Sequence, residues 1–505
     1  MLKKISVILL ALVVLVSSLS MVVSAQSPYT GYNYNSWKKA VPSPTGYLPD
    51  EYYRGQNIEG VGEFKNPSDI FVDHQDRLWV VDTDNNRLVA LDKDFNLIKI
   101  IDHVIYKGVE TPLNLPQSMY ITEDGEFYIA DTANARVLRV VEETLEVEFS
   151  YEKPKSELYE FGRFEPLKIA VDSSDILYVL CRDVNRGFIT FDKKGTFLSY
   201  FGTPKIQVTA EVIAQSFWQQ FMSEEQRDSA LQYSPIEYKS IEIDNDGFVY
   251  ATIFPENPAG GDQLKKLNAK GVGILKQTRH PIVERKSSTI YFGDRDMRRI
   301  KNKAMPNQFV DVKVNKDCTA FFLLDNAHGK VFTYDEECNF LYVFGGIGSQ
   351  KGLFADAVAV DMIGNTIYVL DNDTASITSF KPTTFGQLVE NAAYLYNIGE
   401  YEKAVEPWNQ VLQYNSNYEL AYSGLGKAEL EKENYKLAME YFELAQDTKG
   451  YEDAFKEYRE IMLKENFIYI FIVIVGIIVI YFVVSTLKTR KKKLLAKAAQ
   501  GGRRK

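Results

Sequence analysis

The feature that most constrains this chain is a strand–turn–strand unit that occurs six times. Its clearest copy, Asp76 to Leu91, reads D-R-L-W-V-V-D-T-D-N-N-R-L-V-A-L: an apolar strand, a polar turn headed by Asp, and a second strand. Successive turn positions are 49, 50, 71, 73 and 46 residues apart, at Asp82, Asp131, Cys181, Thr252, Asp325 and Asp371. A supersecondary unit repeated at such intervals indicates a repeat architecture.

Further alternating segments precede and follow each turn. An opening strand often includes an aromatic residue and a Pro, as in F-K-N-P-S-D-I-F-V-D, and a strand such as T-F-L-S-Y-F-G closes the unit. Four short antiparallel strands fit the shorter intervals, and radial repetition of such sheets leaves only short edges. The motifs P-x-x-[IM]-x-[VI] and Y-[IV]-[AV]-D-T-x-N-x-R, with a closing turn of the type D-x-x-G, resemble the NHL-repeat family of β-propellers. The match spans about Tyr47 to Lys381. The resemblance implies an all-β propeller of six blades over residues 47–382.

The last unit has no fourth strand of its own, because Lys381-Pro382 leads directly into a helical pattern. We expect Tyr47–Ile58 to supply this strand and so to join the two ends of the ring. Residues 26–46 are rich in Tyr, Asn, Ser, Gly and Pro and show no period. They are expected to form an extended leader.

The two long intervals contain insertions, and the strand order places the first, Thr209–Leu231, on the same face as the Asp-headed turns. Thr209–Leu231 has a helical composition and includes Trp218. Lys276–Lys303 contains nine cations against three acids in a chain whose net charge is −10. This segment is either a solvated charged loop or a dock for an anionic polymer or an acidic partner. Its candidate patch consists of Arg295, Arg298, Arg299 and Lys301.

From Phe385 the pattern changes to a helical one. G-E-Y-E-K-A-V-E-P-W at Gly399–Trp408 matches E-N-Y-K-L-A-M-E-Y-F at Glu433–Phe442 with a shift of 34 residues. A helical hairpin with this period resembles the tetratricopeptide repeat, which presents concave surfaces to partners. The resemblance implies helical repeats over residues 385–463 that bind a protein partner.

Two apolar segments predict the location of the chain. Residues 1–25 combine Lys3-Lys4, an apolar run and a small-residue site, as in a secretory signal peptide. Phe467–Leu487 has 21 residues without a charge, enough for a transmembrane helix. Residues 488–505 contain nine cations and no acid, so this tail is expected in the cytoplasm and the rest outside a bacterial cell membrane. A buried core helix is the alternative for 467–487. The acidic exterior argues against nucleic-acid binding.

The Asp-headed turns are the first candidates for a ligand site. The candidate residues are Asp82, Asp131, Asp325, Asp371, Arg87, Arg136 and Trp218. Asp and Asn also stabilise such turns without a ligand, because their side chains bond the nearby backbone. A Ca²⁺ site needs roughly six or more oxygens, and D-T-D-N at 82–85 supplies few. We therefore expect no cofactor or metal, with Ca²⁺ as the alternative.

Catalytic motifs are absent from the sequence. His74, His103, His280 and His328 lack metal-ligand spacing and are expected to be surface or turn residues. Cys181 is expected to pack in a strand, while Cys318 and Cys338 either form a disulfide or remain thiols. The sequence favours a membrane-anchored binding or scaffold protein, possessing two interaction folds in series. The alternative is a propeller hydrolase or lyase of the gluconolactonase type, with scattered site residues.

Overall fold

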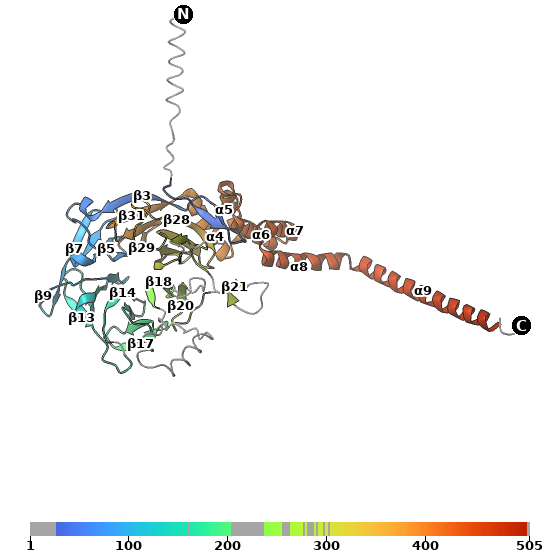
Figure 1. Cartoon of the computed structure of the whole chain (residues 1–505), viewed down its shortest axis with the longest axis horizontal. Coiled ribbons are helices and arrows are strands. Elements are labelled where there is room, and N and C mark those ends of the chain that lie inside the picture. The colour runs from blue at the N-terminus through green and yellow to red at the C-terminus, as the bar shows by residue number, and fades with distance from the viewer. Residues whose placement is uncertain are drawn as a thin grey trace, which may run out of the picture. The chain divides into compact units, whose positions relative to one another are not determined.

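The computed structural model describes residues 27–159, 162–203, 237–254, 263–275, 278–279, 287–288, 291–295, 298–300 and 303–501. The signal peptide and the insertion Thr209–Leu231 predicted from the sequence lie outside these ranges. Contacts divide the chain into two compact units, Met1–Asn397 and Ile398–Lys505. The first contains β-sheets and the second contains helices (Figure 1).

The first unit is a six-bladed β-propeller, as predicted (Figure 1). Blade 1 is a four-stranded sheet of β4 (Asp69–Val72), β5 (Leu78–Asp82), β6 (Arg87–Leu91) and β7 (Leu97–Ile101). Blade 2 consists of β10 (Ser118–Ile121), β11 (Phe127–Asp131), β12 (Arg136–Val140) and β13 (Val147–Tyr151). Blade 3 consists of β14 (Pro166–Val171), β15 (Leu177–Cys181), β16 (Phe188–Phe191) and β17 (Phe197–Phe201). Blade 4 has three strands in the described part, β18 (Tyr238–Ile243), β19 (Val249–Ile253) and β20 (Leu264–Leu267). Blade 5 consists of β25 (Phe309–Val314), β26 (Ala320–Asp325), β27 (Lys330–Asp335) and β28 (Phe340–Gly345). Blade 6 consists of β29 (Ala357–Ile363), β30 (Thr366–Asp371), β31 (Ser376–Pro382) and β3 (Tyr47–Arg54).

The first strands of the blades form the inner ring. Contacts run from β4 to β10, β14, β18, β25 and β29, and β29 contacts β4 again. The second strand of each blade is buried along nearly its whole length, because it packs against neighbouring blades on both faces. This is why these strands read as continuous apolar runs instead of alternating ones.

The ring is closed by a strand from the N-terminal side of the propeller. β3 pairs antiparallel with β31, from Tyr47 opposite Pro382 to Arg54 opposite Ser376. Tyr47 is fully buried and its ring stacks on Phe344 at 5.0 Å. The predicted closing strand is therefore confirmed, although a short 3-10 turn replaces its last residues.

The leader preceding β3 contains a short hairpin, β1 (Tyr32–Tyr34) and β2 (Ala40–Pro42), whereas the sequence showed no period there. Strand β1 contacts β28, so the hairpin lies on blade 5. Smaller strand pairs are β8 (His103–Tyr106) with β9 (Val109–Pro112), β21 (Thr278–Arg279) with β22 (Ser287–Ser288), and β23 (Arg298–Ile300) with β24 (Lys303–Met305).

Helix α4 (Thr384–Asn397) belongs to the propeller unit and contacts β27, β28 and β31. Its Glu390 accepts hydrogen bonds from the hydroxyls of Tyr342 on β28 and Tyr47 on β3. Burial raises the pKa of Glu390 and of Tyr342. One buried carboxyl thus joins the helix to blade 5 and to the closing strand.

The second unit consists of α5 (Tyr401–Tyr414), α6 (Glu419–Glu431), α7 (Tyr435–Leu444), α8 (Thr448–Glu465) and α9 (Phe467–Gly501). Helices α5 and α7 begin at residues 34 apart, Tyr401 and Tyr435. The matched small residues Ala404 and Ala438 are both fully buried. Consecutive helices contact each other from α5 to α8.

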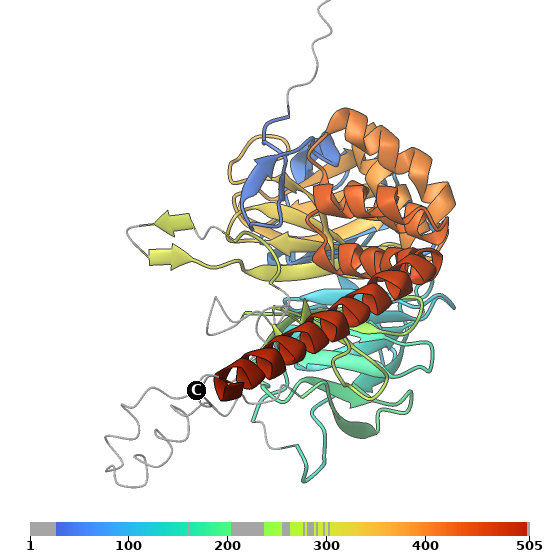
Figure 2. The same cartoon turned by 90° about the vertical axis from the view of Figure 1, so that its right-hand side faces the viewer.

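Helix α9 is one continuous helix, drawn in dark red in Figure 2. Its segment Phe467–Ala496 is long and apolar enough to cross a membrane. The most apolar 18-residue window of this segment has a mean hydropathy of 3.2, and none of that window is buried. A buried core helix would have its apolar side chains covered, so the exposure of α9 favours the membrane-spanning interpretation.

Candidate functional site

The Asp-headed turns of blades 1 and 2 are stabilised by the same set of hydrogen bonds. The Asp82 carboxylate accepts from the backbone N–H of Lys65 at 2.7 Å, from Asn85 at 2.8 Å and from Arg87 Nε at 2.7 Å. The Asp131 carboxylate makes the equivalent bonds, with Asn114, Asn134 and Arg136. Both aspartates are fully buried. Their oxygens are thus engaged inside their own blades.

The other turn positions follow the same principle with different partners. Asp371 accepts backbone N–H groups from Thr374 and Ala355 at 2.8 and 2.6 Å. Cys181 and Thr252, where the repeat lacks Asp, are buried in β15 and β19. Burial raises the pKa of the Cys181 thiol, as expected for a packed residue. The geometry therefore favours an architectural role for these positions, and their role in ligand binding stays a prediction.

The remaining sequence candidates are only partly described. Trp218, His280 and Lys301 lie outside the described residues, and Arg298 and Arg299 are placed on β23 without their side chains. Arg295 lies 5.4 Å over the ring of Tyr34, and its backbone N–H donates to the Tyr34 hydroxyl at 3.0 Å. It is therefore attached to the leader hairpin. No disulfide joins Cys318 and Cys338 in the described structure.

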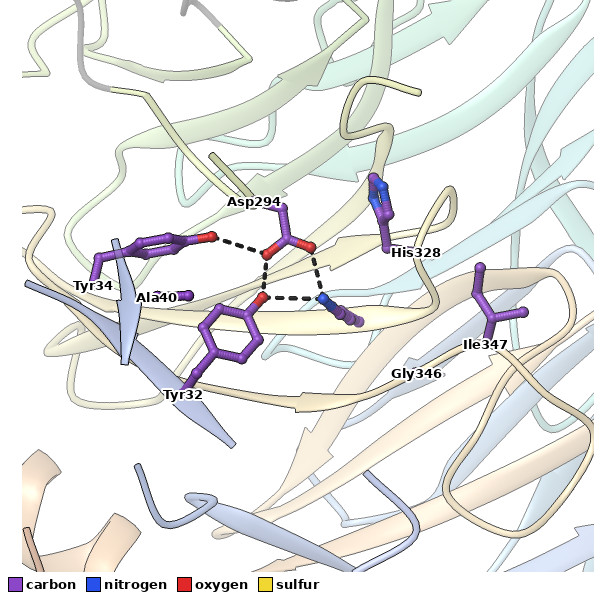
Figure 3. Close-up of a pocket in the computed structure, with 8 residues that line it drawn as sticks. Tyr32, Tyr34, Ala40, Asp294, His328, Gly346 and Ile347 are labelled. Atoms are coloured by element: carbon purple, nitrogen blue, oxygen red, sulfur yellow. Dashed lines mark hydrogen bonds and ion pairs between the residues drawn. The ribbon is translucent and has the colours of Figure 1, made fainter. Parts of the chain in front are cut away.

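A cavity of about 440 Å³ lies where the leader hairpin meets blade 5 (Figure 3). Strands β1, β2 and β27 contribute to it, together with the turn before β27 and the loop after β28. The lining residues are Tyr32, Tyr34, Ala40, Asp294, His328, Lys330, Gly346 and Ile347. We call this cavity the hairpin pocket.

Asp294 is the centre of the polar wall of the hairpin pocket (Figure 3). Its carboxylate accepts from the hydroxyls of Tyr32 and Tyr34 and from Lys330 Nζ, the last at 2.6 Å. Burial and the neighbouring carboxylate raise the pKa of Tyr32, so its hydroxyl stays protonated and donates. The backbone N–H of Asp294 donates to Asn307 at 3.0 Å. The acid, the lysine and the tyrosines are therefore held in one preformed arrangement.

His328 is the second polar group of the pocket wall. Its Nδ1 lies 2.6 Å from the Asp325 carboxylate, and the residue is 5% exposed. Nε2 has no hydrogen-bond partner among the described residues and is inaccessible to water, so it does not open into the hairpin pocket. His328 therefore contributes the edge of its buried side chain to the wall.

The hairpin pocket lies where the blade repeat departs from its pattern. Lys330 pairs with Asp325 in the strand register, as Arg87 does with Asp82. In blade 5, however, His328 bonds the aspartate, and Lys330 is directed to Asp294 and Tyr32 instead. The signals available in the sequence were the change from D-T-D-N-N-R to D-N-A-H-G-K and the Tyr-rich leader.

A larger cavity of about 600 Å³ lies between blades 2 and 3. Its cations Arg163 and Arg182 both approach Glu165, at 3.5 and 3.0 Å. Their side chains are largely exposed, so this cavity is a solvated groove lined by paired charges. It carries less specific chemistry than the hairpin pocket.

The central channel is filled by a charge network on the first strands. Lys168 Nζ lies 2.5 Å from Asp69, and Lys313 Nζ lies 2.8 Å from Glu242 and 2.9 Å from Asp361. The space left among these side chains is about 30 Å³, far below the roughly 300 to 1,000 Å³ of usual small-molecule sites. This part of the channel is therefore a packed ionic core.

Burial raises the pKa of two channel acids, to about 6 for Asp69 and about 7 for Glu242. The neighbouring Lys168 and Lys313 lower these pKa values but do not offset the desolvation. Within the described residues no group of three or more His, Cys, Asp or Glu side chains is arranged to hold a metal ion.

The scan against protein-family models and the search of curated proteins found no match. Solved structures with similar folds include virginiamycin B lyase from Staphylococcus aureus, with 12% identity, a TM-score of 0.39, and coverage of 66% of this chain and 98% of that one. Another is the extracellular domain of a one-component system from B. thetaiotaomicron, with 12% identity, a TM-score of 0.35, and coverage of 67% and 39%. Kuenenia stuttgartiensis hydrazine synthase matches with 11% identity, a TM-score of 0.37, and coverage of 64% and 96%. The count of six blades comes from the strand pairing of this chain itself.

Replacement of Asp82 tests the role of the Asp-headed turns. Asp82→Asn places an NH₂ group against the donors of Asn85 and Arg87, so we expect the free energy of unfolding of the propeller to fall by about 2 to 4 kcal/mol. Asp84→Asn makes the same chemical change at an exposed position of the same turn and should cost less than about 0.5 kcal/mol. Urea unfolding with hydrogen exchange of blade 1 measures both. If both variants lower the free energy of unfolding equally, the Asp82 carboxylate has no special role in stabilising the blade.

The channel acids predict how stability depends on pH. Their folded-state pKa values lie above the ordinary 3.8 and 4.5, so the folded propeller binds more protons than the unfolded chain between about pH 4 and 7. Stability therefore falls as the pH rises through this window, by roughly 1 to 3 kcal/mol. Urea unfolding at pH 5, 6, 7 and 8 measures how the free energy of unfolding changes with pH. This change should be smaller for Glu242→Gln than for the unmodified chain, and unaltered for Glu123→Gln, a control at an exposed residue. If Glu242→Gln leaves the pH dependence of the free energy of unfolding unchanged, the channel acids are not its cause.

Proposed function

We propose that this chain is a membrane-anchored binding protein whose propeller holds a small polar ligand in the hairpin pocket. The observation that carries this proposal is the Asp294 carboxylate, which Lys330 and the hydroxyls of Tyr32 and Tyr34 hold in the wall of a preformed cavity. Preformed pockets of about 300 to 1,000 Å³ with a few fixed polar groups are the usual form of small-molecule sites. The cavity combines such groups with the apolar atoms of Ala40 and Ile347.

The helical unit is proposed to bind a membrane protein beside the anchor. Helix α8 exposes Tyr451, Phe455 and Met462, which are 38%, 44% and 41% exposed. These positions share one side of the helix, because they are four and seven residues apart. The proposal places this unit outside the cell and the basic tail inside, since cytoplasmic flanks of membrane helices are enriched in Lys and Arg.

The alternative function is that of a hydrolase or lyase, and the pair Asp325–His328 favours it. A carboxylate that orients a histidine through Nδ1 leaves Nε2 to act as an acid or a base. In the described residues no Ser, Thr or Cys side chain lines the hairpin pocket as a nucleophile. We therefore favour binding.

Blocking the mouth of the hairpin pocket tests the proposed function. Ile347→Trp adds bulk at a residue that lines the cavity and is 48% exposed, and Ile98→Trp makes the same change at a residue 47% exposed on blade 1. The full chain in nanodiscs is screened with sugars, organic acids and amino acids by thermal shift. We expect at least one probe to raise the Tm of the propeller by about 3 °C or more at saturation. The shift should vanish in Ile347→Trp and persist in Ile98→Trp.

The same screen separates the alternatives. A shift that persists in Ile347→Trp places the ligand elsewhere, and a panel without any shift contradicts the proposal. Turnover of a bound probe that is lost in His328→Asn would instead support the enzymatic alternative.

Cross-linking in intact cells tests the membrane arrangement. A benzophenone amino acid at Phe455 should give an adduct with a membrane protein, whereas the same group at Glu460, an exposed residue elsewhere on α8, should give little. External trypsin should remove a propeller epitope and spare an epitope placed after Lys505. Adducts of equal yield at both positions, or loss of the C-terminal epitope, would count against the arrangement.

A further inference from the structure

We infer that the ligand of the hairpin pocket is a neutral, hydroxyl-rich molecule of the saccharide class. This inference rests on the proposed function and adds the chemical identity of the ligand. It follows from the charge balance of the pocket wall, from the cations beside its two tyrosine rings and from its remaining hydrogen-bonding capacity.

The charges of the pocket wall are already balanced. Asp294 is 8% exposed and bonds Lys330 at 2.6 Å. An anionic ligand would compete with Asp294 for the lysine and would lie beside a buried carboxylate. A cationic ligand would meet the ammonium of Lys330. Since an uncompensated charge in a buried site is costly, the wall disfavours both and accepts a neutral molecule.

Cations lie beside both tyrosine rings of the pocket wall. Lys330 Nζ lies 4.9 Å from the ring centroid of Tyr32, and the Arg295 guanidinium lies 5.4 Å from that of Tyr34. The rings themselves meet edge to face at 5.7 Å. An ammonium ligand held by these rings would lie close to both cations and be repelled by them, so this arrangement argues against such ligands a second time.

The unused hydrogen-bonding capacity requires both donors and acceptors. An ammonium has three N–H donors, and Lys330 gives two of them to Asp294 and Tyr32. Among the described residues, one N–H therefore remains for a ligand oxygen. A carboxylate can accept roughly four hydrogen bonds, and Asp294 accepts one each from Tyr32, Tyr34 and Lys330. Its oxygen that faces Lys330 therefore keeps an acceptor site for a ligand hydroxyl. A hydroxyl group both donates and accepts, so adjacent hydroxyls on one ring suit the two sites.

Titration calorimetry with matched sugars tests the ligand class. The probes are glucose, glucuronate and glucosamine, together with the corresponding galactose series. Within each series the ring is the same and the charge is zero, negative or positive. With the full chain in nanodiscs, we expect a neutral member to bind at least tenfold more tightly than both charged members. Binding should be lost in Ile347→Trp and retained in Ile98→Trp.

A second variant tests the polar wall directly. Asp294→Asn with Lys330→Met removes the ion pair without leaving one charge buried alone. We expect this double variant to weaken the neutral sugar at least tenfold, with its fold checked by hydrogen exchange of blade 5. An unchanged affinity in the folded double variant would overturn the inference.

The outcomes distinguish the inference from the proposed function. If a charged member binds more tightly and Ile347→Trp abolishes its binding, the ligand class is wrong and the binding function stands. The same conclusion follows if only a probe from outside the sugar series binds in the pocket. If no probe of any class binds, both the ligand class and the binding function are refuted.

Discussion

The pairing of β3 with β31 is the interaction on which the rest of the molecule depends. It converts an open series of blades into a ring, so that the first strands enclose a packed ionic core. It also determines where the N-terminal leader lies, because residues 27–46 directly precede β3. The hairpin formed by β1 and β2 therefore lies on blade 5, and the hairpin pocket exists as a consequence of ring closure.

Blade 5 shows how a repeat acquires a site without losing its fold. Asp325 is buried and bonded like its counterparts, but its partner is His328 instead of the residue at the arginine position. That exchange leaves Lys330 available to the insertion and the leader. In blade 5 His328 bonds the turn aspartate and Lys330 bonds Asp294, whereas in blade 1 Arg87 bonds the turn aspartate itself.

The blades and the closing strand could be predicted from the sequence, because the period of the Asp-headed turns and the missing last strand are local signals. The hairpin pocket could not. Its acid, Asp294, lies in an insertion, and its tyrosines precede the propeller by more than ten residues. Only the three-dimensional contact of three distant segments gives these residues a common environment. Likewise, His328 could be placed in a turn, while its burial depends on packing that no periodicity records.

Ring closure also has a consequence for the order of events during synthesis. Tyr47 and Pro382 pair across about 330 residues of chain, and domains fold from the N-terminus as the chain emerges. β3 must therefore wait, as an unpaired strand, until the last blade has been made. Contacts of such long sequence separation form slowly and leave edges exposed to aggregation. Helix α4 follows immediately, and the bonds of Glu390 to Tyr342 and Tyr47 retain the late-closing strand once it has docked.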